Sequence, residues 1–205
     1  MAEASFEIVM PYVFADEGGY VDHPEDPGGA TNMGITFDTL QDWRGQPITK
    51  ADVKALTQSE AMAIYGANYW DKIKGDDLPA GVDYAVLDFA INSGPKRAAE
   101  FLQRMVGVED DGKIGPVTLA ATAKAVPSEL VASYCDARLR WLKGLDTWDT
   151  FGKNWERRVK DVRKHALELT AKAPEPVPVP ETGITLEELE QRVVALERNV
   201  AGLRS

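Results

Sequence analysis

The chain has 205 residues, 44% of them hydrophobic, and carries 23 Lys and Arg against 33 Asp and Glu, a formal net charge of −10. This composition suits one globular body with a short additional segment and excludes disorder over most of the length. The acidic balance argues against nucleic acid as a partner, because its phosphates would repel the protein. No apolar run approaches the roughly 20 residues of a membrane span, so we expect no stable membrane insertion.

The first predicted helix ends at a glutamate that is followed by two glycines. Phe6, Met10 and Glu17 fall on one stripe of this helix, since the spacing from Phe6 to Glu17 is close to three whole turns. A carboxyl at the end of an apolar stripe loses hydration, which favours the protonated form that a general acid needs. Gly18 should end the helix and leave the carboxyl open to a cleft, whereas Pro11 should kink the helix or begin a shorter one.

A loop rich in turn residues and acids follows the helix. Asp26 begins the sequence DPGG, a turn signal that predicts a short hairpin within residues 19–36. This hairpin would bring Asp26, Thr31 and Asn32 opposite Glu17. A protonated Glu opposite an ionised Asp, with a hydroxyl or amide to hold water, is the apparatus of glycoside hydrolysis. Either Thr31 or Asn32 could supply the hydroxyl or amide.

The remaining body is predicted to be helical. Thr49 with Asp52, and Thr57 with Glu60, have the spacing of capping boxes. Gly144 is a candidate C-cap. Four prolines precede helical patterns and fit first-turn positions: Pro79, Pro95, Pro116 and Pro127. The predicted fold class is therefore mainly α, with at most a small β-hairpin near the active site.

Two further features concern ligands. Tyr69 and Trp70 lie on one side of a predicted helix, where aromatic rings usually fill the core but can also stack on sugars. His23 stands among acidic residues, yet the spacing matches neither an EF-hand nor a zinc site. We therefore expect no metal and no cofactor.

The end of the chain has a different pattern. Residues 174–183 include the alternating prolines of PEPVPVP, which predict a stiff linker. In residues 184–205, Leu and Val recur at spacings of three and four, the a/d pattern of a coiled coil. Leu occupies every d position and Val most a positions, which favours a parallel dimer. We expect this helix to form a homo-oligomer, with packing on the chain's own body as the alternative.

Several motifs together resemble glycoside hydrolase family 108, the N-acetylmuramidases of the lysozyme-like superfamily that are common as phage endolysins. The resemblance spans roughly residues 5–170. It is carried by EGGY at 17–20, DPGGATNMGIT at 26–36, FAINSGP at 89–95, DGKIGPVTL at 111–119 and FGKNWERRV at 151–159.

The resemblance implies a lysozyme-like helical body, with a catalytic part at residues 1–92 and a peptidoglycan-binding-like part at 93–173. It implies Glu17 as the catalytic acid. Related phage lysozymes place an Asp nine residues after the Glu, as Asp26 is here, and a Thr a few residues later. Tyr20 and Asn92 lie within the motifs, and we expect them to bind substrate together with Tyr69 and Trp70.

The predicted function is hydrolysis of the β-1,4 bond between MurNAc and GlcNAc in peptidoglycan glycan strands, for bacterial cell lysis. A lytic transglycosylase that cuts the same bond, or a non-catalytic wall-binding phage protein, are the alternatives. The N-terminus has no Lys or Arg before its apolar part, so no signal peptide is predicted. We expect synthesis in the host cytoplasm and action on peptidoglycan in the periplasm or cell wall.

Overall fold

The computed structural model describes residues 3–22 and 29–172, and only the backbone of residues 3 and 4. The chain divides into two units, Met1–Ala173 and Pro174–Ser205, and the described residues belong to the first. The predicted linker at 174–183, the coiled coil at 184–205 and Asp26 lie outside the described residues.

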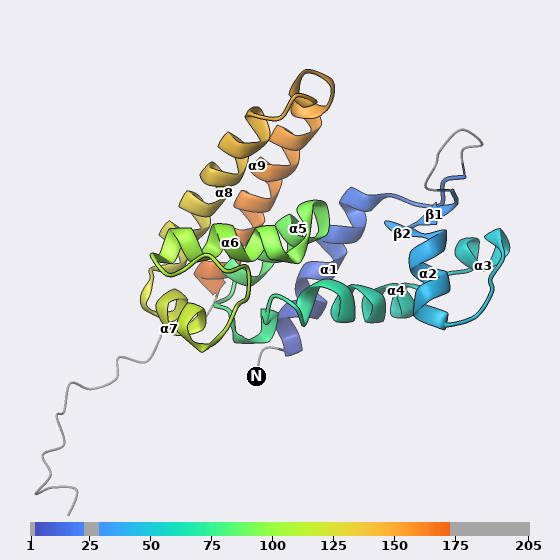
Figure 1. The fold of residues 1–205 in the computed structure, drawn as a ribbon, viewed down its shortest axis with the longest axis horizontal. Helices are drawn as coiled ribbons and strands as arrows, with labels where there is room; N and C mark the ends of the chain where they lie inside the picture. The colour runs from blue at the N-terminus through green and yellow to red at the C-terminus, as the bar shows by residue number, and fades with distance from the viewer. Residues whose placement is uncertain (1–2, 23–28, 173–205) are drawn as a thin grey trace, which may run out of the picture. The chain divides into compact units, whose positions relative to one another are not determined.

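The described part is mainly helical, as the sequence predicts, with one small antiparallel hairpin (Figure 1). None of its helices is long and apolar enough to cross a membrane. The α-helices are α1 (Glu3–Glu17), α2 (Phe37–Arg44), α3 (Lys50–Lys54), α4 (Gln58–Tyr65), α5 (Val82–Ser93), α6 (Pro95–Val106), α7 (Pro116–Lys124), α8 (Pro127–Lys143) and α9 (Trp148–Lys172).

The hairpin is shorter than the predicted range but lies within it. Strand β1 (Thr31–Asn32) pairs with β2 (Ile35–Thr36), and a single bridge joins Val21 to Thr31. Met33 and Gly34 form the two-residue turn, with φ of 49° and 74°. Positive φ at both central residues is typical of a type I′ turn, whose twist matches that of the flanking strands.

The first helix does not stop at its proline. Helix α1 continues through Pro11 to Glu17, so no shorter helix begins at the proline. The capping box of Thr49 and Asp52 forms in full at the start of α3.

The second predicted box forms only in half. Thr57 accepts from the Glu60 amide, but both Glu60 carboxylate oxygens accept from Arg44 at 2.8 Å, so this carboxylate pairs with a cation instead of returning to the cap.

Helix α5 lies at the centre of the C-terminal part and packs against α1, α6, α8 and α9. Most of its residues are buried, including Val86, Leu87 and Phe89. Helices α8 and α9 lie side by side along their length, joined by a short connection that begins at Gly144, the C-cap of α8 (Figure 1).

Three of the four prolines occupy first-turn positions, at the starts of α6, α7 and α8. Pro79 instead precedes α5 by one turn, and its carbonyl accepts from the amides of Val82 and Asp83.

An acidic side chain is buried at the start of α5. Asp83 is 1% exposed, and its carboxylate accepts from the Ser5 hydroxyl and, at 2.6 Å, from the amide of Tyr84. Burial raises the pKa of Asp83 to about 6, although these hydrogen bonds oppose the shift. The folded protein therefore holds a proton on Asp83 at a pH where the unfolded chain has already released it.

This linkage predicts a pH-dependent effect of Asp83→Asn. The stability that a raised carboxyl pKa provides is complete below about pH 4 and is lost as the pH rises through 6, a total of up to about 3 kcal/mol. The neutral amide removes this loss, so stability relative to wild type should rise by that amount between pH 4 and pH 7. Urea unfolding at each pH measures it, with the exposed Asp71→Asn as control. Parallel profiles for wild type and Asp83→Asn would contradict the assignment.

Candidate active site

Glu17 is the last residue of α1, and Gly18 turns the chain away from the helix. Gly18 has a φ of 76°, and its amide still reaches the carbonyl of Phe14 at 3.3 Å. The Glu17 side chain is 20% exposed. The helix end therefore presents a carboxyl group that is mostly enclosed but open to solvent on part of its surface.

One oxygen of Glu17 is paired with an arginine that is distant in the sequence. Glu17 Oε1 lies 2.7 Å from Nη2 of Arg158, a residue of α9. The same Nη2 lies 2.7 Å from Oδ1 of Asp88 in α5, and Arg158 Nε donates to that oxygen at 2.9 Å. Because the guanidinium bridges two carboxylates, the Glu17 carboxyl is held in place from α9 and indirectly from α5.

Asp88 is buried and serves two arginines. Its other oxygen accepts from Nη1 of Arg138, which is also buried, in α8. Burial alone would raise the pKa of Asp88, but Arg138 and Arg158 outweigh it and lower that pKa. Burial likewise opposes the charge of Arg158, yet Asp88 and Glu17 raise the pKa of its guanidinium. Asp88 and Arg158 are therefore both ionised at neutral pH.

The hairpin turn approaches Glu17 from another side. A methyl group built on Gly34 would collide with the Tyr65 hydroxyl and come within 2.9 Å of Glu17 Oε2. The Tyr65 hydroxyl donates to the carbonyl of Met33 at 3.0 Å. Burial, and then the charge of Glu17, raise the pKa of Tyr65, which stays a neutral hydrogen-bond donor. The Met33–Gly34 turn, Tyr65 and Arg158 together enclose the carboxyl.

Of the two aromatic residues predicted to bind sugar, one lies beside this carboxyl. Tyr69 is partly exposed, its ring lies 5.7 Å from that of Tyr65, and burial and the charge of Glu17 raise its pKa. Trp70 is 3% exposed, its indole donates to Asp76 at 2.9 Å, and its ring packs on Phe6. The structure thus places the Trp70 ring in the core, while Tyr69 is partly exposed.

Thr31 and Asn32, the two alternatives for the group that holds water, have different surroundings. The Asn32 amide donates to the carbonyls of Val53 and Lys54 at 3.0 and 3.3 Å, and so fastens the hairpin to α3. Thr31 pairs with Thr36 across the hairpin and is partly exposed. Because side chains alternate along a strand, Thr31 points to the face opposite Asn32.

The two other predicted substrate residues lie on different elements. The Tyr20 hydroxyl is 3.5 Å from Asp22, and Lys54 lies over its ring. Asn92 is exposed at the end of α5 and donates to the carbonyl of Asp88 at 2.9 Å.

Sequence reasoning missed the residues that hold Glu17, namely Asp88, Arg138, Arg158 and Tyr65. One signal was available. Asp88 interrupts the apolar run Ala85–Ala90, and a charge on a buried helix face requires a buried partner of opposite sign. Which arginine supplies it depends on tertiary packing. No group of three or more metal-ligating side chains is gathered within the described residues.

Comparison with known proteins defines the class. Residues 10–94 match glycosyl hydrolase 108, and residues 97–158 match a predicted peptidoglycan domain. The chain belongs to glycosyl hydrolase family 108. Its structure is similar to that of Brucella abortus SagA, with 58% sequence identity and a TM-score of 0.75 over 84% of this chain and 99% of that chain. A search of curated proteins found no match.

The turn against Glu17 predicts a site-specific effect of Gly34→Ala. Gly45 has a similar φ of 63° with open space around it, so Gly45→Ala should cost only the backbone strain of about 1 kcal/mol. Gly34→Ala adds the collision with Tyr65 and Glu17. We expect it to lose at least about tenfold in activity while Gly45→Ala retains wild-type activity. Peptidoglycan clearance and thermal unfolding measure both, and equal activity of the two variants would refute the close approach.

Proposed function

We propose that the protein hydrolyses the MurNAc–GlcNAc β-1,4 bond of peptidoglycan with Glu17 as the general acid, and that this reaction opens the bacterial cell wall. The family match provides the reaction class, and the peptidoglycan-domain match provides the substrate class. The single observation that carries the assignment is the position of Glu17 at the end of α1, 20% exposed and held by Arg158 and the Gly34 turn.

In the proposed reaction, the Glu17 carboxyl protonates the glycosidic oxygen as the bond to the sugar breaks. A carboxyl confined by the Gly34 turn beside Tyr65 can meet that oxygen with little further loss of side-chain freedom, which lowers the barrier. Asp26 would stabilise the oxocarbenium-like centre or position the attacking water. We assign the accompanying hydroxyl to Thr31, because the amide of Asn32 already donates to two backbone carbonyls.

The ion pair between Arg158 and Glu17 imposes a requirement on the proposed reaction. Glu17 Oε1 already contacts the guanidinium, so this oxygen can donate a proton to the substrate only after that contact weakens. Substrate binding must therefore weaken the contact between Arg158 and Glu17.

The general-acid role predicts that Glu17→Gln lowers the rate of peptidoglycan hydrolysis by about two to four orders of magnitude. Glu7→Gln is the matched control, because Glu7 is an exposed residue of the same helix. Activity is followed as new reducing ends on purified peptidoglycan. Wild-type rates for Glu17→Gln would show that another residue supplies the proton.

The products distinguish hydrolysis from transglycosylation. Hydrolysis adds water and leaves reducing muramic acid ends, whereas a lytic transglycosylase leaves anhydro ends. We expect mass spectrometry of the wild-type digest to show reducing ends. Anhydro ends alone would overturn the hydrolase assignment, and an undigested wall would favour a binding role.

The C-terminal unit carries a separate proposal, that residues 184–205 join copies of the chain. A chain shortened to residues 1–173 should keep its specific activity, because Glu17 and its contacts lie in the first unit. Its mass by light scattering should fall by more than the removed residues account for. Full-length and shortened chains of the same oligomeric state would refute the proposal.

A further inference from the structure

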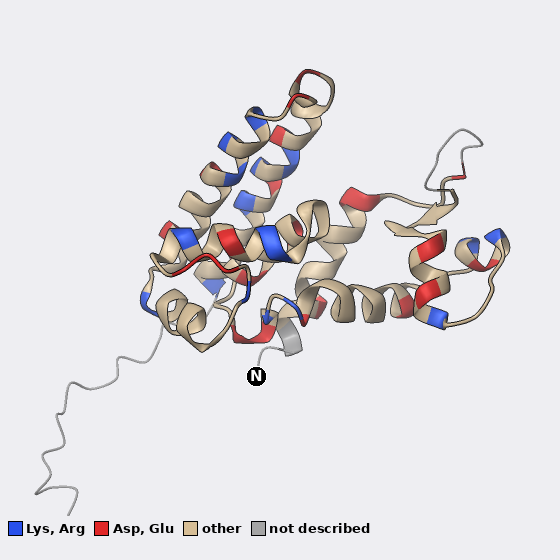
Figure 2. Ribbon diagram, in the orientation of Figure 1, with Lys and Arg blue, Asp and Glu red and all other residues tan. Residues whose placement is uncertain are grey.

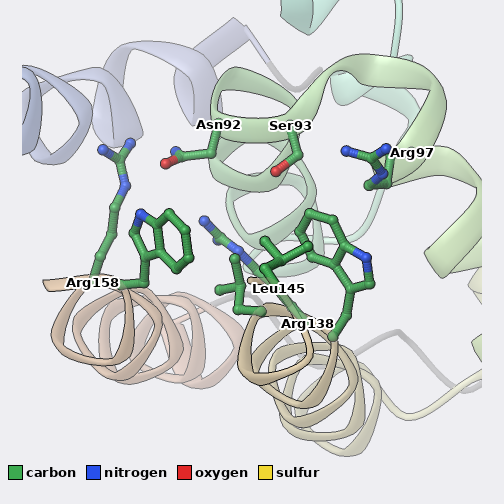
Figure 3. A pocket seen from close by; sticks show the side chains of 9 residues that line it. Asn92, Ser93, Arg97, Arg138, Leu145 and Arg158 are labelled. Atoms are coloured by element: carbon green, nitrogen blue, oxygen red, sulfur yellow. The ribbon is translucent and has the colours of Figure 1, made fainter. Parts of the chain in front are cut away.

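A cavity of about 180 Å³ lies where the end of α5 and the start of α6 face α8 and α9. Its lining contains Arg97, Arg138 and Arg158 but no carboxylate. Figure 3 shows Arg97 and Arg158 on opposite sides of the cavity with Arg138 between them. Asn92 and Ser93, at the end of α5, complete the polar part of the wall.

The arginines have more positive charge than their protein partners neutralise. Arg138 and Arg158 share Asp88, and Arg158 also contacts Glu17. Arg97 forms no ion pair with any residue that the structure describes, and its guanidinium lies 4.7 Å from the centre of the Trp141 ring. The Nε of Arg138 is buried without a hydrogen-bond partner in the described part of the chain. Unused guanidinium donors around a cavity are suited to an anionic ligand.

The charge of the neighbouring helices also favours an anionic ligand. Residues 127–172, which form α8, α9 and their connection, hold ten Lys and Arg against seven Asp and Glu. Residues 1–126 hold ten Lys and Arg against twenty Asp and Glu. Figure 2 shows basic positions along both α8 and α9. The cavity therefore borders the basic part of an otherwise acidic protein.

The volume of the cavity and its apolar walls limit which anionic ligands can fit. Trp141, Trp155, Leu142 and Leu145 supply apolar surface beside the arginines. Pockets for drug-sized molecules have volumes of roughly 300 Å³ or more. A cavity of about 180 Å³ is suited to a single carboxyl-bearing group of amino-acid size, and is too small for a disaccharide.

Arg158 connects this cavity to the candidate active site, because its side chain lines the cavity and its guanidinium contacts Glu17. We propose that the cavity binds a carboxylate of the peptidoglycan repeat beside the bond that is cut. This inference rests on the proposed function. That carboxylate belongs either to the peptide stem or to the lactyl group of a stem-free muramic acid. Both are carboxylates attached close to the sugar ring.

A bound carboxylate would act on the reaction as well as on affinity. It accepts hydrogen bonds from Arg158 and so competes with Glu17 for that guanidinium. The contact between Arg158 and Glu17 weakens only when a charged substrate occupies the cavity, which meets the requirement stated for the general acid. Charged substrates should therefore differ from neutral ones in kcat and not only in KM.

The test uses the full chain, Arg97→Met and the control Lys96→Met. Arg97 is exposed and lines the cavity, whereas its neighbour Lys96 does not line it and lies 3.8 Å from Glu100. The substrates are glycan strands with intact stems, strands whose carboxyls are converted to amides, and stem-free strands with the lactyl carboxylate. New reducing ends give kcat and KM, and thermal unfolding confirms the fold of each variant.

We expect wild type to cleave stem-bearing or stem-free strands about tenfold more efficiently than amide-converted strands, and the preferred strand identifies the source of the carboxylate. Arg97→Met should lose most of this preference, and Lys96→Met should keep it. Equal wild-type rates on charged and amide-converted strands would overturn the proposal, as would equal behaviour of the two variants. Failure of the proposed function would look different, because wild type would then cleave none of the strands.

Discussion

The buried carboxylate of Asp88 imposes the constraint on which the arrangement around Glu17 depends. An isolated charge in a protein interior is costly, and removing one partner of a buried ion pair commonly destabilises a protein by about 3–5 kcal/mol. Asp88 therefore keeps both Arg138 and Arg158 beside it, and this ties α5 to α8 and α9. Since one guanidinium can contact two carboxylates, the same requirement brings Arg158 to Glu17 at the end of α1. The contact between Arg158 and the proposed acid thus depends on a charge buried in another helix.

This dependence makes the two family matches parts of one site. Glu17 and Asp88 lie within residues 10–94, whereas Arg158 is the last residue of the match at 97–158. Neither segment contains the whole arrangement. The peptidoglycan-domain segment consequently does more than add a binding surface, because it supplies a cation that contacts the carboxyl of the hydrolase segment.

The features that were predictable from sequence arise from interactions between close neighbours. Pro95, Pro116 and Pro127 mark helix starts because a proline lacks the amide that the first turn does not use. Glu17 could be placed at a helix end because two glycines follow it. The half-formed cap at Thr57 was not predictable, since Arg44 decides it through tertiary packing. Which of Tyr69 and Trp70 is buried was not predictable either, because it depends on the contact of Trp70 with Phe6. The same holds for Arg158, whose partners belong to α1 and α5.

Net charge is a similarly coarse guide to the partner. A formal charge of −10 would argue against an anionic wall polymer if the charges were spread evenly. Screening limits the reach of exposed charges to about 8–10 Å at physiological ionic strength, so a binding group responds mainly to its immediate surroundings. The cavity wall holds Arg97, Arg138 and Arg158 and no carboxylate, and the buried charge of Arg138 is screened less than an exposed one. An acidic protein can therefore hold an anionic ligand through a local excess of arginines, without long-range attraction to the wall.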